Sequence, residues 1–247
     1  GYKRKCRALI LTGPTGAGKH FAARQLARAN VSHFEVAVSH TTRARREGER
    51  DGVDYVFVGR EAFDIAARAQ EFLCVCEVEG ELYGVKKERV NTITASGRVC
   101  VITGDMKGAL AMRRALAGDL MPRTVFFQPT QSSIEAHLSA VLARDPGATW
   151  SVEERTAKAE KEYDHVFAGP KGLFDMELEV RFDDEDPFAV SPETCQELSK
   201  WVFSQSWEVI QSSDLDRAAI KIQGQARRRR DANKVRRIQE EQDASKE

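Results

Sequence analysis

Long hydrophobic runs are missing from this chain of 247 residues: no stretch approaches the roughly 20 consecutive apolar residues that a membrane-spanning helix requires. The first residues also lack the apolar segment of a secretory signal peptide. We therefore expect a cytoplasmic chain without membrane insertion. Aromatic residues make up 8% and the mean hydropathy is -0.47, values that exclude a disordered or fibrous chain. Because the chain starts at Gly1 without an initiating methionine, we expect it to be a segment of a longer polypeptide.

Cysteine is scarce, with five residues at positions 6, 74, 76, 100 and 195. The odd number and the strand-like apolar surroundings of most of them predict reduced thiols rather than a disulfide framework. Cys74 and Cys76 are two residues apart and share one face of the strand predicted there, but no second pair stands at zinc-ligand spacing. We rank a metal site there below simple packing and predict none.

Short apolar runs alternate with segments of helical periodicity, which predicts an α/β fold with a parallel sheet covered by helices on both faces. Strands are expected at about 6–11, 34–38, 54–58, 72–78, 99–102 and 123–127, and helices after the first strand and at about 61–69, 106–116, 132–142, 151–163 and 193–207. The stretch 169–192 includes a possible short strand at 176–182, but its prolines, glycines and acidic cluster predict a surface excursion.

A glycine-rich loop follows the first strand and opens the first helix. Its spacing, Gly-x-x-x-x-Gly-Lys, is that of a P-loop, in which backbone N–H groups and the helix N-terminus hold phosphate oxygens and the lysine bridges two phosphates. An ordinary glycine-rich turn is the alternative, and we favour phosphate binding because strand, loop, lysine and helix are all in place. The predicted phosphate-binding residues are Gly13, Thr15, Gly16, Ala17, Gly18 and Lys19.

The residue after Lys19 is His20, where a P-loop normally has the Ser or Thr that binds Mg²⁺. A neutral imidazole is a poor ligand for this hard cation. We therefore expect any Mg²⁺ to be held weakly, or by water and phosphate alone.

Further blocks at 38–49, 51–58, 71–73, 80–84 and 105–108 follow in order. Together with the P-loop they resemble guanylate kinases and their scaffold relatives, the membrane-associated guanylate kinase homologues, from about Lys5 to Trp207. The resemblance implies a P-loop NTPase-type sheet with a small monophosphate-binding subdomain at about 37–91, a lid at about 144–165, and a C-terminal helix. We place the whole domain at 1–211 and a basic tail at 212–247.

By this resemblance the cofactors would be ATP and Mg²⁺, and catalysis would depend on Lys19, Asp105 and two lid arginines, Arg144 and Arg155, that close over the transferring phosphoryl group. Guanidinium forks and hydroxyl donors suit a phosphate dianion. The residues implied to hold the monophosphate are Ser39, Arg43, Arg46, Tyr55 and Tyr83.

Other positions depart from the family. The glutamate that reads guanine aligns with Cys74, its Ser/Thr partner with Val85, and the first member of an Asp-x-Asp pair with Thr103. We expect Val85 to place an apolar wall against a bound base, and base selectivity to be lost. The sequence thus predicts an interaction module with little or no GMP kinase turnover. An active nucleoside monophosphate kinase with compensating residues elsewhere is the alternative.

The tail is electrostatically different from the body, because residues 217–237 carry a net charge of +8 in a chain whose total is zero. Ile222, Gln223 and Arg227 resemble the core of an IQ motif, which binds calmodulin or related light chains. A polyanion- or cytoskeleton-binding segment and a loosely packed solvated helix are the rival interpretations. We rank calmodulin first and nucleic acid low, and we expect other proteins of a larger, cytoskeletal or ciliary, assembly as partners.

Overall fold

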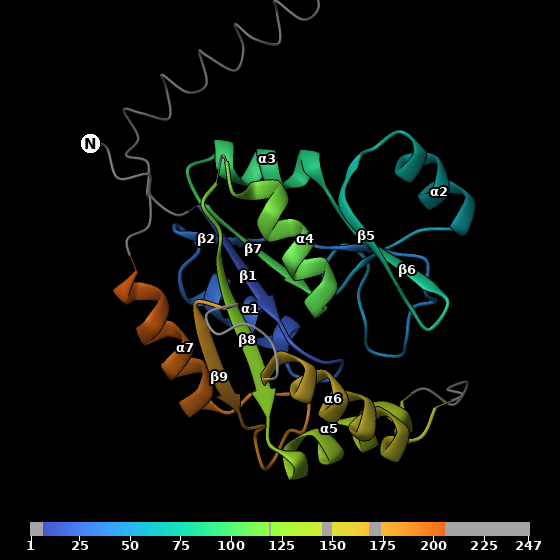
Figure 1. Cartoon of the computed structure of the whole chain (residues 1–247), viewed down its shortest axis with the longest axis vertical. Helices are drawn as coiled ribbons and strands as arrows, with labels where there is room; N and C mark the ends of the chain where they lie inside the picture. The colour runs from blue at the N-terminus through green and yellow to red at the C-terminus, as the bar shows by residue number, and fades with distance from the viewer. Residues whose placement is uncertain (1–6, 119, 145–149, 168–173, 206–247) are drawn as a thin grey trace, which may run out of the picture.

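The computed structural model describes residues 7–118, 120–144, 150–167 and 174–205. Its centre is a parallel sheet with the strand order β2-β7-β1-β8-β9 (Figure 1). The strands are β1 (Ala8–Thr12), β2 (Phe34–Val36), β7 (Val99–Gly104), β8 (Arg123–Pro129) and β9 (Met176–Val180). The predicted α/β class with a parallel sheet is confirmed.

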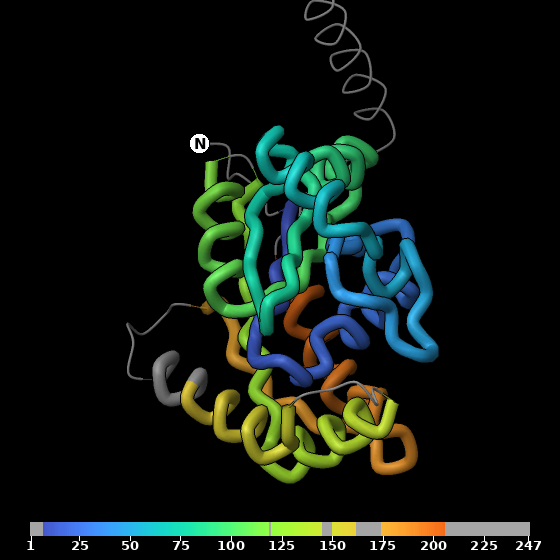
Figure 2. Tube along the Cα trace, turned by 90° about the vertical axis from the view of Figure 1, so that its right-hand side faces the viewer, coloured from blue at the N-terminus to red at the C-terminus, as the bar shows by residue number. Residues whose placement is uncertain are grey.

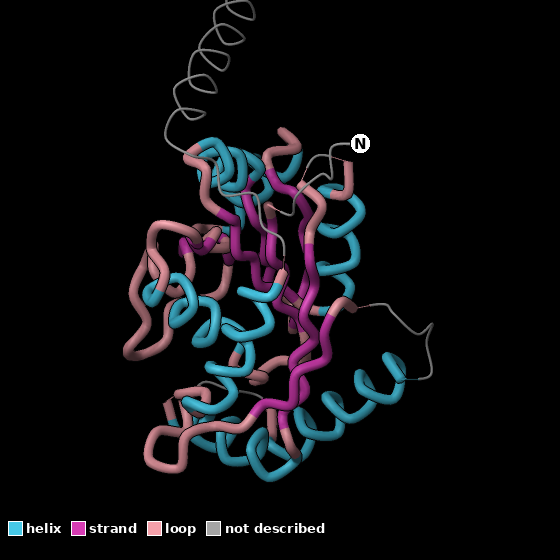
Figure 3. The backbone as a smooth tube through the Cα atoms, turned by 90° about the vertical axis from the view of Figure 1, so that its left-hand side faces the viewer, coloured by secondary structure: helices cyan, strands magenta, loops and turns pink. Residues whose placement is uncertain are grey.

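Helices cover both faces of this sheet, as Figure 3 shows. Helices α1 (Lys19–Ala29) and α7 (Pro192–Ser204) lie on one face, and α3 (Lys87–Ala95) and α4 (Met106–Leu116) on the other. Alternation along β1 fits this layering, because Leu9 and Leu11 pack toward α1 and α7 while Ile10 packs toward α3 and α4. The buried strands hold the carboxyl ends of β1 and β7 side by side.

A second, mixed sheet forms a subdomain beside the first, with the strand order β4-β3-β6-β5. Its strands are β3 (His40–Thr41), β4 (Val56–Phe57), β5 (Phe72–Val78) and β6 (Glu81–Lys86). Helix α2 (Arg60–Arg68) packs Phe63 against Phe72, and the two stacked rings lie 4.4 Å apart between centroids. This small core gives the subdomain its own support.

Two further helices, α5 (Gln131–Ala143) and α6 (Val152–Phe167), lie at the end of the sheet toward which β8 points (Figure 1). The side chain of Thr130 caps α5, and Ala159 of α6 packs against Ile134 and Leu138 of α5. In Figure 2 the blue segment with β3 and β4 lies above this helix pair. The two units face one another across the carboxyl edge of the central sheet.

The expectation of a surface excursion at 169–192 was wrong for residues 176–180, whereas Asp184, Glu185 and Asp186 beyond them are exposed as expected. Residues 176–180 form β9, the parallel edge strand beside β8, and Leu178 and Val180 are fully buried. Alternation of buried and exposed residues along β9 is the pattern of a half-buried strand, and the nearby prolines and acidic residues obscured it. The structure also adds β3, β6 and α3, which were not predicted.

Among the described residues, no helix is both long and apolar enough to cross a bilayer. The four cysteines within them are free thiols, in agreement with the expectation of reduced cysteine. The IQ-like residues 222, 223 and 227 lie outside the described residues, so the predicted partner of the tail stays a prediction.

Candidate functional site

A cavity of about 470 Å³ opens between the carboxyl edge of the central sheet, the small sheet and α5. It brings together every residue that the sequence analysis assigned to phosphate binding or catalysis in the body of the chain. These residues are Gly13, Thr15, Gly16, Ala17, Gly18, Lys19, Ser39, Arg43, Arg46, Tyr55, Tyr83, Asp105, Arg144 and Arg155. Residues from segments far apart along the chain thus converge on one space large enough for a nucleotide-sized ligand.

The P-loop wraps tightly between β1 and α1. Gly13 and Gly18 have positive φ angles of 143° and 76°, and neither has room for a side chain. A Cβ at Gly13 would lie 2.5 Å from the Phe127 carbonyl oxygen, and one at Gly18 would lie 2.4 Å from Val190. The Lys19 ammonium is buried and donates to the carbonyl oxygens of Gly13, at 2.8 Å, and Pro14, at 2.7 Å. The loop therefore holds its lysine at the wall of the cavity.

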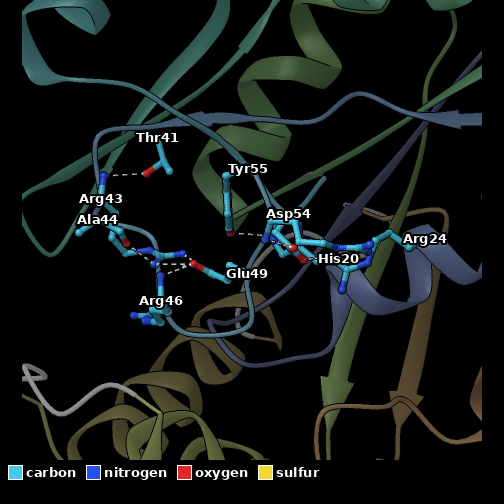
Figure 4. A network of polar contacts seen from close by, with 10 residues as sticks. His20, Arg24, Thr41, Arg43, Ala44, Arg46, Glu49, Asp54 and Tyr55 are labelled. Atoms are coloured by element: carbon cyan, nitrogen blue, oxygen red, sulfur yellow. Dashed lines mark hydrogen bonds and ion pairs between the residues drawn. The ribbon is translucent and has the colours of Figure 1, made fainter. Parts of the chain in front are cut away.

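Glu49 organises the predicted monophosphate site. The Arg43 guanidinium donates to both of its carboxylate oxygens, at 2.7 and 3.1 Å, and the Arg46 backbone N–H donates to it at 2.8 Å (Figure 4). Burial would lower the pKa of Arg43, but the hydrogen bonds and charge of Glu49 outweigh this and raise the pKa. Arg43 is therefore a fixed cation at the cavity wall.

Tyr55 and Tyr83 bring their rings together in an edge-to-face arrangement, with centroids 5.7 Å apart. Burial raises the pKa of Tyr55 above its usual range, so its hydroxyl keeps its proton. Ser39, which precedes β3, is also buried. Tyr55 therefore supplies a neutral hydroxyl group near Arg43.

His20 connects three segments of the site. Its Nε2 lies 2.9 Å from the Tyr55 hydroxyl, and its Nδ1 lies 3.1 Å from the hydroxyl of Thr103 at the end of β7. Burial, followed by the charges of Lys19 and Arg24, lowers the pKa of His20 to about 3. The imidazole is therefore neutral at physiological pH and uses both ring nitrogens within the protein.

The two lid arginines are held differently. Arg155 of α6 is buried, forms an ion pair with Glu79, and lies 3.7 Å from the centroid of the Trp150 ring. Arg144, at the end of α5, is exposed and lies 3.6 Å from the centroid of the Phe188 ring. Glu79 is in the turn between β5 and β6, so its contact with Arg155 links the lid to the small subdomain.

The expectation that Val85 walls the cavity was wrong. Val85 is only 2% exposed and packs with core residues below α3 and α4, outside the lining of the cavity. Cys74 packs against the same core, and its thiol approaches the Gly108 carbonyl oxygen at 3.9 Å. Cys76, two residues farther along the strand, lines the cavity instead. Burial raises the pKa of Cys76 to about 12, so it presents an uncharged thiol.

The residues at the position of the expected Mg²⁺ ligands do not fit this cation. His20 offers no hydroxyl, and its nitrogens are occupied by Tyr55 and Thr103. The Asp105 carboxylate caps α4 by accepting from the Gly108 N–H at 2.7 Å. Within the described parts of the chain, no group of three or more histidine, cysteine or acidic side chains is arranged to hold a metal. The strength of Mg²⁺ binding expected from His20 stays a prediction.

Sequence reasoning identified the cations of the site but missed their counter-ions. Glu49 could have been found, because it is three residues beyond Arg46 in the same loop. The ion pairs of Arg24 with Asp54 and of Arg155 with Glu79 join segments 30 and 76 residues apart, respectively. Nothing in the local sequence indicates such partners.

Known proteins share both the sequence pattern and the fold. The guanylate kinase family model matches residues 5–178. The guanylate kinase of Sus scrofa is 32% identical over 194 residues, which cover 78% of this chain and 94% of that protein. Protein PALS1 of Danio rerio is 30% identical over 166 residues, covering 65% of this chain but 24% of that protein.

A solved structure agrees. The crystal structure of guanylate kinase from Anaplasma phagocytophilum matches with a TM-score of 0.55 at 24% identity, covering 85% of this chain and 89% of that one. This likeness supports the fold, and the family match covers the P-loop, the small subdomain and most of the central sheet. The chain belongs to the guanylate kinase family.

Proposed function

We propose that this domain binds the phosphate groups of nucleotides in its cavity, has little or no GMP kinase turnover, and serves as an interaction module of a larger assembly. The observation that carries the proposal is the contrast between the groups suited to phosphate and the positions that read the base in this family. Cationic side chains converge on it from the P-loop, the small subdomain and the lid, whereas the family's guanine-reading positions hold Cys74 and Val85, which pack into the core.

Phosphate binding is supported by the arrangement of fixed donors. Lys19 is buried in the P-loop, Arg43 is held by Glu49, and Arg155 reaches the opposite wall from α6. Pre-organised cations bind anions at a low entropic cost, because few rotamers are lost on binding.

Loss of turnover is supported by the side chains that a guanine base would contact. A guanine bound in this cavity lacks the family carboxylate that would accept its amide and amine protons, because Cys74 holds that position and packs against the core, while the cavity lining beside it carries the neutral Cys76 thiol. Each lost hydrogen bond to a charged group weakens binding by about 1.5–3 kcal/mol. A site that leaves these groups unpaired also loses its preference for guanine.

The direct test is phosphoryl transfer from ATP to GMP, measured as ADP formed, with Sus scrofa guanylate kinase as the positive control. We expect turnover below about 1% of the control, a barrier difference of roughly 3 kcal/mol or more. Calorimetric titration with ATP is expected to show binding that Lys19→Ala removes. GMP-dependent ADP formation at the rate of the control, abolished by Lys19→Ala, would contradict the proposal.

The alternative is an active ATP-dependent nucleoside monophosphate kinase. It is favoured by one observation: Lys19, Arg144 and Arg155 line the same cavity as the predicted monophosphate site. Turnover in the same assay with another nucleoside monophosphate in place of GMP would establish this alternative, provided that Lys19→Ala abolishes it.

We also propose, from the sequence alone, that Ile222, Gln223 and Arg227 bind calmodulin or a related light chain. Two variants separate this from general attraction to polyanions or cytoskeletal surfaces. I222A/Q223A keeps the charge of the tail, whereas R236A/R237A reduces it and keeps the Ile-Gln pair. In a titration with calmodulin, with and without Ca²⁺, the first variant is expected to lose more affinity; a greater loss in the second would favour the polyanion interpretation.

A further inference from the structure

His20 lies where a P-loop of the usual pattern has a small hydroxyl residue directed at Mg²⁺. Its imidazole is larger than a hydroxyl group and reaches across the cavity floor from α1 to Thr103 of β7 and to Tyr55 of the small subdomain. Thr103 in turn aligns with a family aspartate, so a hydroxyl replaces a carboxylate at the other end of the bridge. The two replacements therefore contact one another, and together they remove the P-loop hydroxyl that normally binds Mg²⁺ and a carboxylate beside it.

The bridge also constrains protons. A neutral imidazole carries one N–H, so one ring nitrogen donates and the other accepts. If Nε2 accepts from Tyr55, the Tyr55 O–H donates its hydrogen bond to His20, and its oxygen can only accept hydrogen bonds from a ligand in the cavity. If Nε2 donates to the Tyr55 oxygen, Nδ1 accepts from the Thr103 hydroxyl, and the Tyr55 O–H is left to donate to a ligand. A phosphate, which accepts hydrogen bonds, selects the second arrangement.

Four acidic side chains that line the cavity already have partners. Asp54 pairs with Arg24, Glu49 with Arg43, and Glu79 with Arg155. One carboxylate oxygen of Asp105 accepts the hydrogen bond that caps α4. Moving Asp54, Glu49 or Glu79 to a metal would leave its arginine partner unpaired.

We propose that the His20–Thr103–Tyr55 bridge takes the place of the divalent cation, so that the cavity binds nucleoside phosphates as metal-free anions, with His20 in the Nε2–H form and the Tyr55 hydroxyl donating to phosphate. The proposal rests on the proposed function, since it concerns the same cavity, and it adds the form in which the ligand is bound. Thr103 and His20 act as positioning residues for Tyr55.

The test titrates ATP into the whole chain by calorimetry, once with excess MgCl2 and once with EDTA. The dissociation constants are expected to differ by less than about fivefold. The double variant H20S/T103D restores a hydroxyl and a carboxylate and is expected to bind ATP at least about tenfold more tightly with Mg²⁺ than with EDTA. Thr103→Ser keeps the hydroxyl and is expected to share the wild-type indifference to Mg²⁺.

Two results would overturn the inference alone: wild-type affinity that rises about fivefold or more with Mg²⁺, or a double variant that remains indifferent to it. Failure of the wild type to bind ATP in either buffer would overturn the proposed function as well, so the two failures are distinguishable. Long-range ¹⁵N–¹H correlation spectra give an independent readout. With saturating inorganic phosphate, His20 is expected in the Nε2–H form, and an Nδ1–H form would refute the proton arrangement.

Discussion

The P-loop wall of the cavity is one continuous segment, whereas the opposite wall is assembled from distant segments joined by ion pairs. On the first wall, glycine backbone and the carbonyl oxygens of Gly13 and Pro14 hold Lys19. On the second, Glu49 and Glu79 hold Arg43 and Arg155. The comparison teaches that the first cation is positioned by local chain geometry, whereas the other two are positioned by acidic side chains.

Removing the cation of the first wall should have the largest effect. Lys19→Ala deletes a buried charge that no neighbouring side chain can replace, and we expect ATP affinity to fall about 100-fold, since bonds to charged groups contribute up to about 3 kcal/mol. Calorimetry measures it. Lys107→Ala, an exposed lysine of α4 outside the cavity lining, is the matched control and should bind like the wild type.

The contribution of His20, which joins the two walls, to the free energy of unfolding should depend on pH. His20 has a pKa of about 3 in the folded chain against 6.5 when unfolded, so the unfolded state binds the extra proton first as pH falls below 6.5. Folding stability from His20 is therefore present above 6.5 and lost on acidification, by about 2 kcal/mol between pH 7 and pH 5.

Urea denaturation at several pH values measures this loss. The histidines at 40 and 137, whose pKa values are also lowered by burial, remain in His20→Asn, so the difference between wild type and variant isolates His20. Parallel stability curves for the two proteins between pH 7 and pH 5 would contradict a neutral buried His20.

Loss of Glu49 should disorganise the second wall to a smaller extent. Glu49→Ala removes the partner of the Arg43 guanidinium and of the Arg46 backbone N–H. We expect affinity for a phosphate monoester such as GMP to fall about tenfold, because the arginine is no longer pre-organised. Glu61→Ala, an exposed residue of α2 outside the cavity lining, is the control for calorimetry. An increase in affinity would mean that Glu49 acts mainly as a competitor of phosphate.

Substitution of Glu79 should have the smallest effect on binding, and it should raise the affinity rather than lower it. Its side chain is 42% exposed, so its ion pair with Arg155 contributes little to stability. Glu79→Gln removes the competing charge and should tighten ATP binding about threefold by leaving Arg155 available to phosphate. Glu77→Gln, an exposed position on the same hairpin, is the control in the same titration. Weaker binding in Glu79→Gln would show that the ion pair positions Arg155 rather than occupying it.

The elements best predicted from sequence are those with local signals. Met106–Leu116 and Phe72–Val78 were predicted with the observed bounds, since their periodicity is read within a few residues. A possible short strand was predicted at 176–182 but placed on the surface, and β6 and α3 were missed. The position of β9 depends on its pairing with β8, and the positions of β6 and α3 depend on the core in which Val85 packs. The local sequence pattern contains neither kind of contact.

The sequence by itself determined the phosphate-binding loop and the family, because glycine conformation, the lysine and the ordered motifs are local properties of the chain. Only the tertiary structure decided which residues meet: that His20 joins Tyr55 and Thr103, that Val85 faces the core, and that Cys76 faces the cavity. Hydrogen bonds, burial and lowered pKa values arise between segments distant along the chain, and packing alone brings those segments together.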